Sequence, residues 1–135
     1  MSRRALQIVL AVLATVAVAS GLAGMVFGPA VLPSASPVDA TVDSEYRFAN
    51  AFWFAAGVVV WWAIPRVEQA TVVLRVALGA AFLGGIARLF AAAASGWPHP
   101  VFLAALGVEL IVIPIVLVWQ GSVAKQSISD IPVRR

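Results

Sequence analysis

The fold is decided by the stretch Thr71–Trp119, TVVLRVALGAAFLGGIARLFAAAASGWPHPVFLAALGVELIVIPIVLVW. Two apolar runs of helical length flank the short turn Ser95–Pro100, whose two prolines interrupt a helix. Each run carries one ionisable residue within its apolar part, Arg88 in the first and Glu109 in the second. A charge inside an apolar span is costly unless it faces a partner or a cavity. The stretch therefore predicts a membrane hairpin with a polar pair inside it.

The composition indicates an integral membrane protein. The chain has 135 residues, of which 62% are hydrophobic and 11% charged, and its mean hydropathy is +1.00. A soluble domain of this length needs a polar outer layer that so few charged residues cannot supply. The net charge of +3 comes mainly from Lys and Arg at the ends of apolar runs, where membrane topology explains them. We therefore expect one membrane domain that contacts the lipid bilayer and binds no nucleic acid.

The sequence lacks the common motifs of enzymes and metal sites. It contains no Cys, and its single His99 has no second His to share a metal ion with. The motifs H-E-x-x-H and G-x-S-x-G and a phosphate-binding Gly loop do not occur, and Gly84-Gly85 falls in the middle of an expected helix. We therefore expect no enzymatic activity, no metal and no cofactor.

Four apolar runs are long enough to cross a bilayer, which takes about 20 residues of helix. The second run is expected to begin near Ser44 as N-cap, with Glu45 in the first turn, where the helix dipole favours an anion. The prolines of the loop Gly28–Ser44 exclude a regular helix before it. The predicted fold is all-α, an antiparallel bundle of four transmembrane helices. The spans cover about residues 5–27, 45–65, 71–95 and 101–119 of a membrane domain 1–120, followed by a polar cytoplasmic tail, 121–135.

The first apolar run can also be interpreted as a signal peptide. Arg3-Arg4 would form its charged start and Ala17-Val18-Ala19 its cleavage site. The apolar character continues past that site to Phe27, which favours a retained membrane helix. 

Small residues recur in the same run at helical spacing. Ser20, Gly24 and Gly28 form a ladder that lets another helix approach closely. Gly and Ala are common in membrane helices, and Ala is abundant throughout this chain. We therefore favour packing within the chain over a homodimer motif.

The distribution of cations predicts the orientation. With four spans, seven of the nine Lys and Arg residues fall on one side or near it, whereas Arg47 and His99 lie near the other boundary. The positive-inside rule then places both termini in the cytoplasm of a bacterial inner (plasma) membrane. The seven cations are Arg3, Arg4, Arg66, Arg75, Lys125, Arg134 and Arg135.

Four polar residues from three helices are expected in the outer half of the bilayer. At the helical rise, Arg88 lies roughly 10 Å and Glu109 roughly 12–15 Å inside the outer ends of their helices. Arg47 and Asn50 lie roughly 5–10 Å in, and Asp43 is within ion-pair reach of Arg47. Because an Arg side chain reaches toward the interface, Arg88 can meet Glu109.

The residues around this pair indicate which way it faces. Small residues share a face with Arg88 and large ones lie opposite, so Arg88 is expected to point into the bundle. Pro114 cannot donate to the carbonyl of Leu110 and should kink the last helix beside Glu109. The small residues are Ala77, Ala81, Gly84, Gly85, Ala91, Ala92 and Ser95, and the large ones are Phe82, Leu83, Ile86 and Phe90.

Three interpretations of the cluster stay open. The Arg88–Glu109 pair can fix the register of two helices, with Arg47 and Asn50 completing a hydrogen-bond network. It can instead form a lipid, substrate or proton site that opens outward, since charge at membrane depth suggests function. It can also contact a helix of a partner protein.

The chain resembles a family of small bacterial four-helix membrane proteins whose function is unassigned. The resemblance runs through GLAGMVFGPAVLP, DSEYRFANAFWFAAG, GGIARLFAAAASGWPHP and VELIVIPIVLVW. Its strongest features are Arg47 in the second helix, Arg88-Leu89 ahead of Gly96-x-Pro98, and Glu109 followed by Pro114. The layout is also distantly similar to DoxX-type four-helix membrane proteins, some of which accompany quinone-linked redox enzymes. The resemblance implies the fold and assigns no activity.

The leading functional hypothesis is a non-enzymatic membrane protein that binds a lipid or small amphiphile, or that assists a membrane complex. In it, Arg47 and Arg88 hold an anionic head group or pair with Glu109. One alternative is a proton-coupled carrier in which Glu109 titrates, which requires a homo-oligomer because four helices are few for transport. Another is an accessory subunit of a membrane redox complex.

Overall fold

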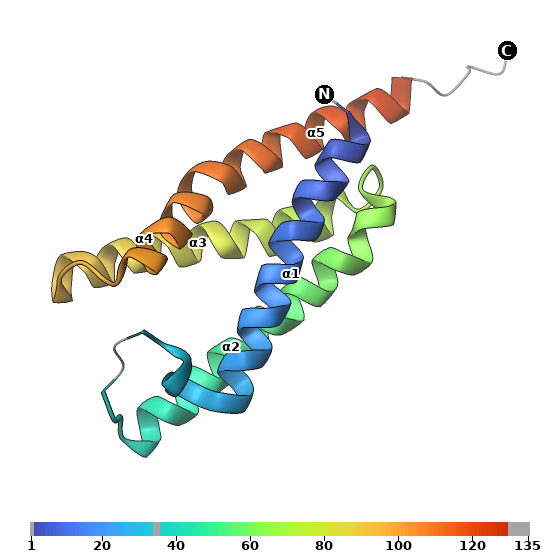
Figure 1. Cartoon of the computed structure of the whole chain (residues 1–135). Helices are drawn as coiled ribbons and strands as arrows, with labels where there is room; N and C mark the ends of the chain where they lie inside the picture. Colours follow the sequence, from blue (N-terminus) through green and yellow to red (C-terminus); the bar gives the residue numbers. More distant parts are fainter. Residues whose placement is uncertain (1, 34–35, 130–135) are drawn as a thin grey trace, which may run out of the picture. The chain divides into compact units, whose positions relative to one another are not determined.

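The computed structural model describes residues 2–33 and 36–129, and the regular elements in this part of the chain are all helices (Figure 1). Four of its helical segments are long and apolar enough to cross a membrane: Arg3–Val31, Ala40–Arg66, Thr71–Ser95 and Pro100–Gln126. The chain divides into two compact units, Val9–Trp62 and Met1–Ile8 with Ala63–Arg135. The elements are α1 (Arg3–Phe27), η1 (Gly28–Val31), α2 (Ala40–Ala63), η2 (Ile64–Arg66), α3 (Thr71–Ser95), α4 (Pro100–Gly107), η3 (Val108–Val112) and α5 (Ile113–Ser129).

Each of the long helices exposes large apolar side chains. On α1, Ile8, Val12 and Val16 recur every four residues and are each 59–64% exposed. Soluble proteins rarely expose continuous apolar stripes of this kind, whereas lipid-facing helices require them. The exposed stripes therefore support a multi-pass membrane protein. Similar side chains on the other helices are Phe48 and Phe52 on α2, Val72, Val76, Leu83 and Phe90 on α3, Ile111 in η3, and Ile115 and Val118 on α5.

Within the unit Val9–Trp62, α1 packs against α2 through small residues. A Cβ atom added to Gly21 would lie 2.6 Å from the backbone nitrogen of Phe54, and one added to Gly24 would overlap the side chain of Asn50. Ser20 Oγ accepts a 3.0 Å hydrogen bond from the indole of Trp53. The ladder residues Ser20 and Gly24 therefore contact α2 of the same chain. Later residues of α1 meet earlier residues of α2, so these two helices run in opposite directions.

Because the helices approach closely at Gly21 and not at Gly84, an added methyl group should change the stability differently at these two glycines. Gly21→Ala should lower the free energy of unfolding by about 1–3 kcal/mol, because the methyl group meets backbone that cannot move aside. Gly84→Ala adds the same group to α3 where no atom lies within 4 Å of it, so stability should stay equal or rise by up to about 1 kcal/mol. Helicity followed by circular dichroism during heating in maltoside micelles measures both. Equal midpoints for the two variants would contradict the packing.

The second helix begins at Ala40, earlier than the start near Ser44 that the sequence predicts. Asp39 acts as the cap: its Oδ1 accepts hydrogen bonds from the backbone N–H groups of Thr41 (2.8 Å) and Val42 (3.0 Å). These two bonds to Val42 and Thr41 also hold the pKa of the Asp39 carboxyl below its usual range. Ser44 therefore lies inside the helix, which begins three residues after Pro37, the last proline of the loop.

In the other unit, α3 packs along α4, η3 and α5. The buried face of α3 includes Leu74 and Leu78 as well as small residues, so it is less uniformly small than the sequence predicts. Gly84 lies off this face, whereas a Cβ added to Gly85 would lie 2.8 Å from Glu109 Cβ. The facing residues of the last helix are Glu109, Ile113, Val116, Gln120, Val123 and Ala124, all buried.

The last span contains a π-helix, η3, which ends at Val112, two residues before Pro114. The N–H of Ile113 donates to the carbonyl of Val108, five residues earlier. Pro114 has no N–H and its ring crowds the carbonyl of Leu110, and the widened turn includes this carbonyl. The sequence predicts the position of the disruption, and the structure gives its form.

Helix α5 continues well beyond Trp119, to Ser129. The expected polar tail, 121–135, is therefore helical over its first nine residues. Its remaining residues, 130–135, lie outside the described residues.

Candidate functional site

Arg88 on α3 and Glu109 in η3 are in direct contact. Arg88 Nε donates to Glu109 Oε1 at 3.2 Å, and the same nitrogen lies 3.0 Å from Oε2. Oε2 is buried and receives no hydrogen bond. The carboxylate is thus held from one side, by Arg88 Nε alone.

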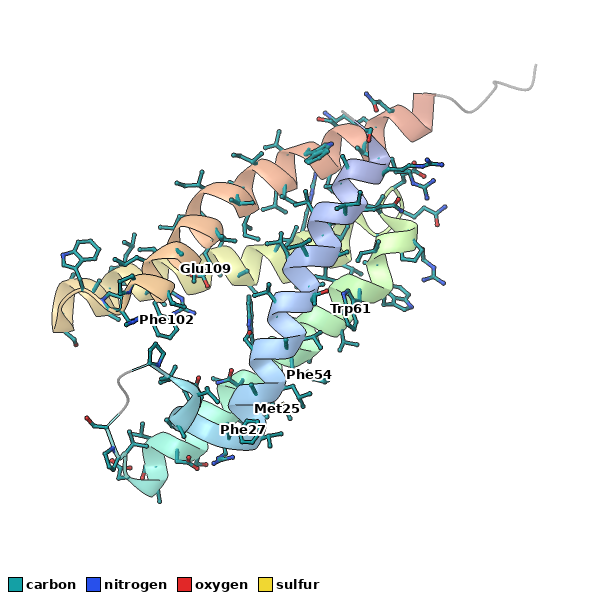
Figure 2. All side chains as sticks on the ribbon, in the orientation of Figure 1. Met25, Phe27, Phe54, Trp61, Phe102 and Glu109 are labelled. Atoms are coloured by element: carbon teal, nitrogen blue, oxygen red, sulfur yellow. The ribbon has the colours of Figure 1, made fainter. Side chains whose placement is uncertain are left out.

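Glu109 is enclosed between two helices because Gly85 leaves room for it. Glu109 is 7% exposed, and its Cβ and the side chain of Leu110 pack directly over Gly85. Figure 2 shows Glu109 on the side of its helix that faces α3. In η3 the backbone is widened at this residue, and π-helical turns are often found where a helix carries a functional side chain.

Arg88 is only partly used by its protein neighbours. Its side chain is 41% exposed, and its guanidinium carbon lies 5.4 Å from the ring centre of Phe102 on α4. That distance allows a cation–π contact. Within residues 2–33 and 36–129, the two terminal amino groups of Arg88 have no hydrogen-bond acceptor, whereas its Nε donates to Glu109. The four N–H donors of these amino groups are therefore not used by the described residues.

Arg47, in contrast, is engaged by protein groups of the unit Val9–Trp62. Its Nε and Nη2 donate to Asp43 at 2.8 and 3.2 Å, which realises the ion pair that the spacing predicts. Its Nη1 donates to the backbone carbonyls of Met25 (2.9 Å) and Val26 (2.8 Å). These carbonyls end α1, and Gly28 follows with φ +65°, the left-handed conformation that closes many helices. Arg47 therefore caps α1.

Asn50 also has a local role. Its Nδ2 donates to the carbonyl of Tyr46 at 2.8 Å, and its side chain fills the space above Gly24. Of the four residues that the sequence groups into one polar cluster, Arg88 and Glu109 are in contact in one compact unit. Arg47 and Asn50 belong to the other unit.

A second set of polar residues escapes sequence reasoning. The turn between α2 and α3 exposes carbonyls that side chains from elsewhere in the unit satisfy: Gln7 donates to Ile64 (2.9 Å), Arg3 to Pro65 (3.1 Å), and Gln120 to Val67 (2.9 Å). The bond to Val67 matters most, because this bond is buried and an unpaired buried carbonyl is costly.

Gln120 is the most enclosed member of this set. It is 0% exposed and also donates to Thr71 Oγ1 at 2.9 Å. One signal could have identified it: Gln120 follows Glu109 by eleven residues, close to three helical turns, and therefore shares its face.

The described residues contain no group of three or more His, Asp or Glu side chains that could hold a metal ion.

A family model described as a domain of unknown function, DUF4345, matches residues 5–120. No curated protein and no solved structure matches the chain.

Proposed function

We propose a function from the geometry of the chain itself, because it belongs to the DUF4345 family, whose function is unknown. The proposed function is that of a non-enzymatic membrane protein that binds an anionic amphiphile at Arg88. In this proposal the four spans form an antiparallel bundle in a bacterial inner membrane, with both termini in the cytoplasm. The concentration of Lys and Arg at one end of the spans supports that orientation.

The observation that carries the proposal is the unused half of the Arg88 guanidinium. Glu109 binds only Nε, so the terminal amino groups need an acceptor that no described residue supplies. In a membrane, acceptors of matching charge are phosphate and carboxylate groups, which a guanidinium binds through two parallel hydrogen bonds.

The position of Arg88 suits a ligand that is part polar and part apolar. Arg88 lies seven residues before the end of α3 at Ser95, or roughly 10 Å along the helix, so its side chain reaches toward the head-group region. Leu89, which follows Arg88 along α3 and is exposed, can contact a hydrocarbon chain. We therefore assign the head group of the ligand to Arg88 and its tail to the lipid-facing surface of α3.

Binding of a defined probe tests this function. Dodecyl phosphate is titrated against the protein in neutral maltoside micelles, and bound ligand is counted by native mass spectrometry. The double variant Arg88→Met/Glu109→Met removes the guanidinium without leaving a lone buried carboxylate, and should bind at least tenfold more weakly, about 1.4 kcal/mol. Arg4→Gln, which removes an exposed cation elsewhere, should bind like the unaltered protein.

The same titration separates this function from a purely architectural ion pair. An ion pair that only fixes helix register predicts equal binding by the double variant and the unaltered protein. That result, with both proteins folded by circular dichroism, would refute the binding role.

A further inference from the structure

A shallow groove lies between α3 and α5, away from Arg88. Its volume is about 440 Å³, within the size range of small-molecule sites. Two of its six lining residues are cations, Arg75 on α3 and Lys125 on α5, and two are apolar, Leu117 and Val118. The remaining lining residues are Gly121 and Ser122.

The side chain of Arg75 reaches across this groove to Gly121 on α5. A Cβ atom on Gly121 would lie 3.7 Å from Arg75 Nη2, so the guanidinium extends from α3 over the surface of α5. Val118, one turn away, is 74% exposed and presents an apolar surface beside the charged part. Ser122 Oγ donates to the carbonyl of Val118, so its proton is already used within α5. The groove thus combines the positive charges of Arg75 and Lys125 with the apolar side chains of Leu117 and Val118.

The cations lie at the depth of lipid head groups. Arg75 is four residues from the start of its span at Thr71, roughly 6 Å, and Lys125 is one residue from the end of its span at Gln126. The bond from Gln120 to Thr71 shows that these two span ends lie at the same end of the hairpin. Arg88 is thirteen residues from Arg75 along α3, roughly 20 Å, so the groove is separate from the site proposed above.

We propose that this groove binds an anionic phospholipid, with the phosphate between Arg75 and Lys125 and an acyl chain along Leu117 and Val118. The two cations select negative charge, and basic grooves between membrane helices suit phosphate head groups. The apolar lining distinguishes a lipid from a free anion, because inorganic phosphate gains nothing from contact with hydrocarbon. 

The test uses the whole protein in nanodiscs made of equal parts phosphatidylglycerol and phosphatidylcholine. Native mass spectrometry counts the lipids that remain bound after the protein is released. The unaltered protein should retain phosphatidylglycerol in preference to phosphatidylcholine. Arg75→Gln/Lys125→Gln should reduce this preference at least fivefold, and Gly121→Leu, which fills the groove while both cations stay, should also reduce it.

Two controls make the result specific. Arg4→Gln removes a cation from the same compact unit but outside the groove and should keep the preference, as should Arg88→Met/Glu109→Met. Unchanged preference in both groove variants would overturn the proposal, and so would an equal loss in Arg4→Gln, which indicates general surface charge. Displacement of the lipid by millimolar inorganic phosphate would also overturn it, because the site would then bind a free anion. Since Arg88 is altered in a separate variant, failure here leaves the function proposed for Arg88 untouched.

Discussion

Replacing Arg88 by methionine is expected to lower the free energy of unfolding by about 3 kcal/mol. Glu109 is buried, and Arg88 is the one described residue that donates to its carboxylate. Removing one partner of a buried ion pair costs about 3–5 kcal/mol, because the remaining charge has neither water nor counter-ion. The lower end of this range applies because Arg88 holds the carboxylate through Nε alone and its side chain is 41% exposed. Denaturation in mixed maltoside and dodecyl sulfate micelles measures the loss.

The double variant Arg88→Met/Glu109→Met is the matched control for this loss. Without the carboxylate no buried charge is left alone, so stability should return to within about 1 kcal/mol of the unaltered protein or exceed it. A further comparison is Phe102→Leu, which removes the aromatic ring beside the guanidinium. The lost cation–π contact should lower the free energy of unfolding by about 1 kcal/mol or less, apart from the loss of buried apolar surface. If Arg88→Met cost no more than Phe102→Leu, the pairing seen in the structure would not contribute to folding.

The parts of this fold that could be predicted are those set by hydropathy. Continuous apolar runs broken by prolines define the four segments that are long and apolar enough to span a membrane, with little dependence on tertiary detail. The contact between α1 and α2 through Ser20 and Gly24 could be expected for a related reason, since only small side chains allow backbones to approach so closely.

Local chemistry at helix ends was harder to predict. Asp39 and Ser44 are both good caps by residue type, and the choice between them depends on how the preceding loop returns to the helix. Before Pro114 the sequence predicts a disrupted helix, but it does not predict the π-helical turn that carries the buried Glu109. Residue identity alone does not contain that information.

The candidate site divides in the same way. Arg88 and Glu109 could be singled out because charge is rare within such apolar runs. Arg47 looked equivalent to Arg88 by this criterion, yet its donors are used by Asp43 and by the end of α1. Gln7 and Gln120 carry no charge and lie near span ends, where polar residues are common. Their long-range bonds to the α2–α3 turn could therefore not be predicted from the sequence.

The strongest test of this polar network is Gln120→Met, which is expected to lower the free energy of unfolding by about 2–4 kcal/mol. Methionine has a similar length, so the cavity term is small. The loss comes from two hydrogen bonds and from the Val67 carbonyl, which stays buried without a donor. Part of it is offset because the substitution also removes Gln120 Oε1, which is buried and has no hydrogen-bond partner among the described residues. Denaturation in mixed micelles measures this loss as well.

Two further variants identify which bond of Gln120 matters. Thr71→Val removes only the hydroxyl acceptor and should cost about 1 kcal/mol, because Gln120 Nε2 keeps its 2.9 Å bond to Val67. Ser122 lies two residues away on the exposed side of α5 and its hydroxyl donates within its own helix, so the effect of Ser122→Ala should stay within about 0.5 kcal/mol. An equal loss for Gln120→Met and Ser122→Ala would mean that the turn carbonyls are satisfied without Gln120. The expected order, Gln120→Met largest and Ser122→Ala smallest, follows because a buried carbonyl at the membrane boundary cannot exchange a lost side-chain donor for water.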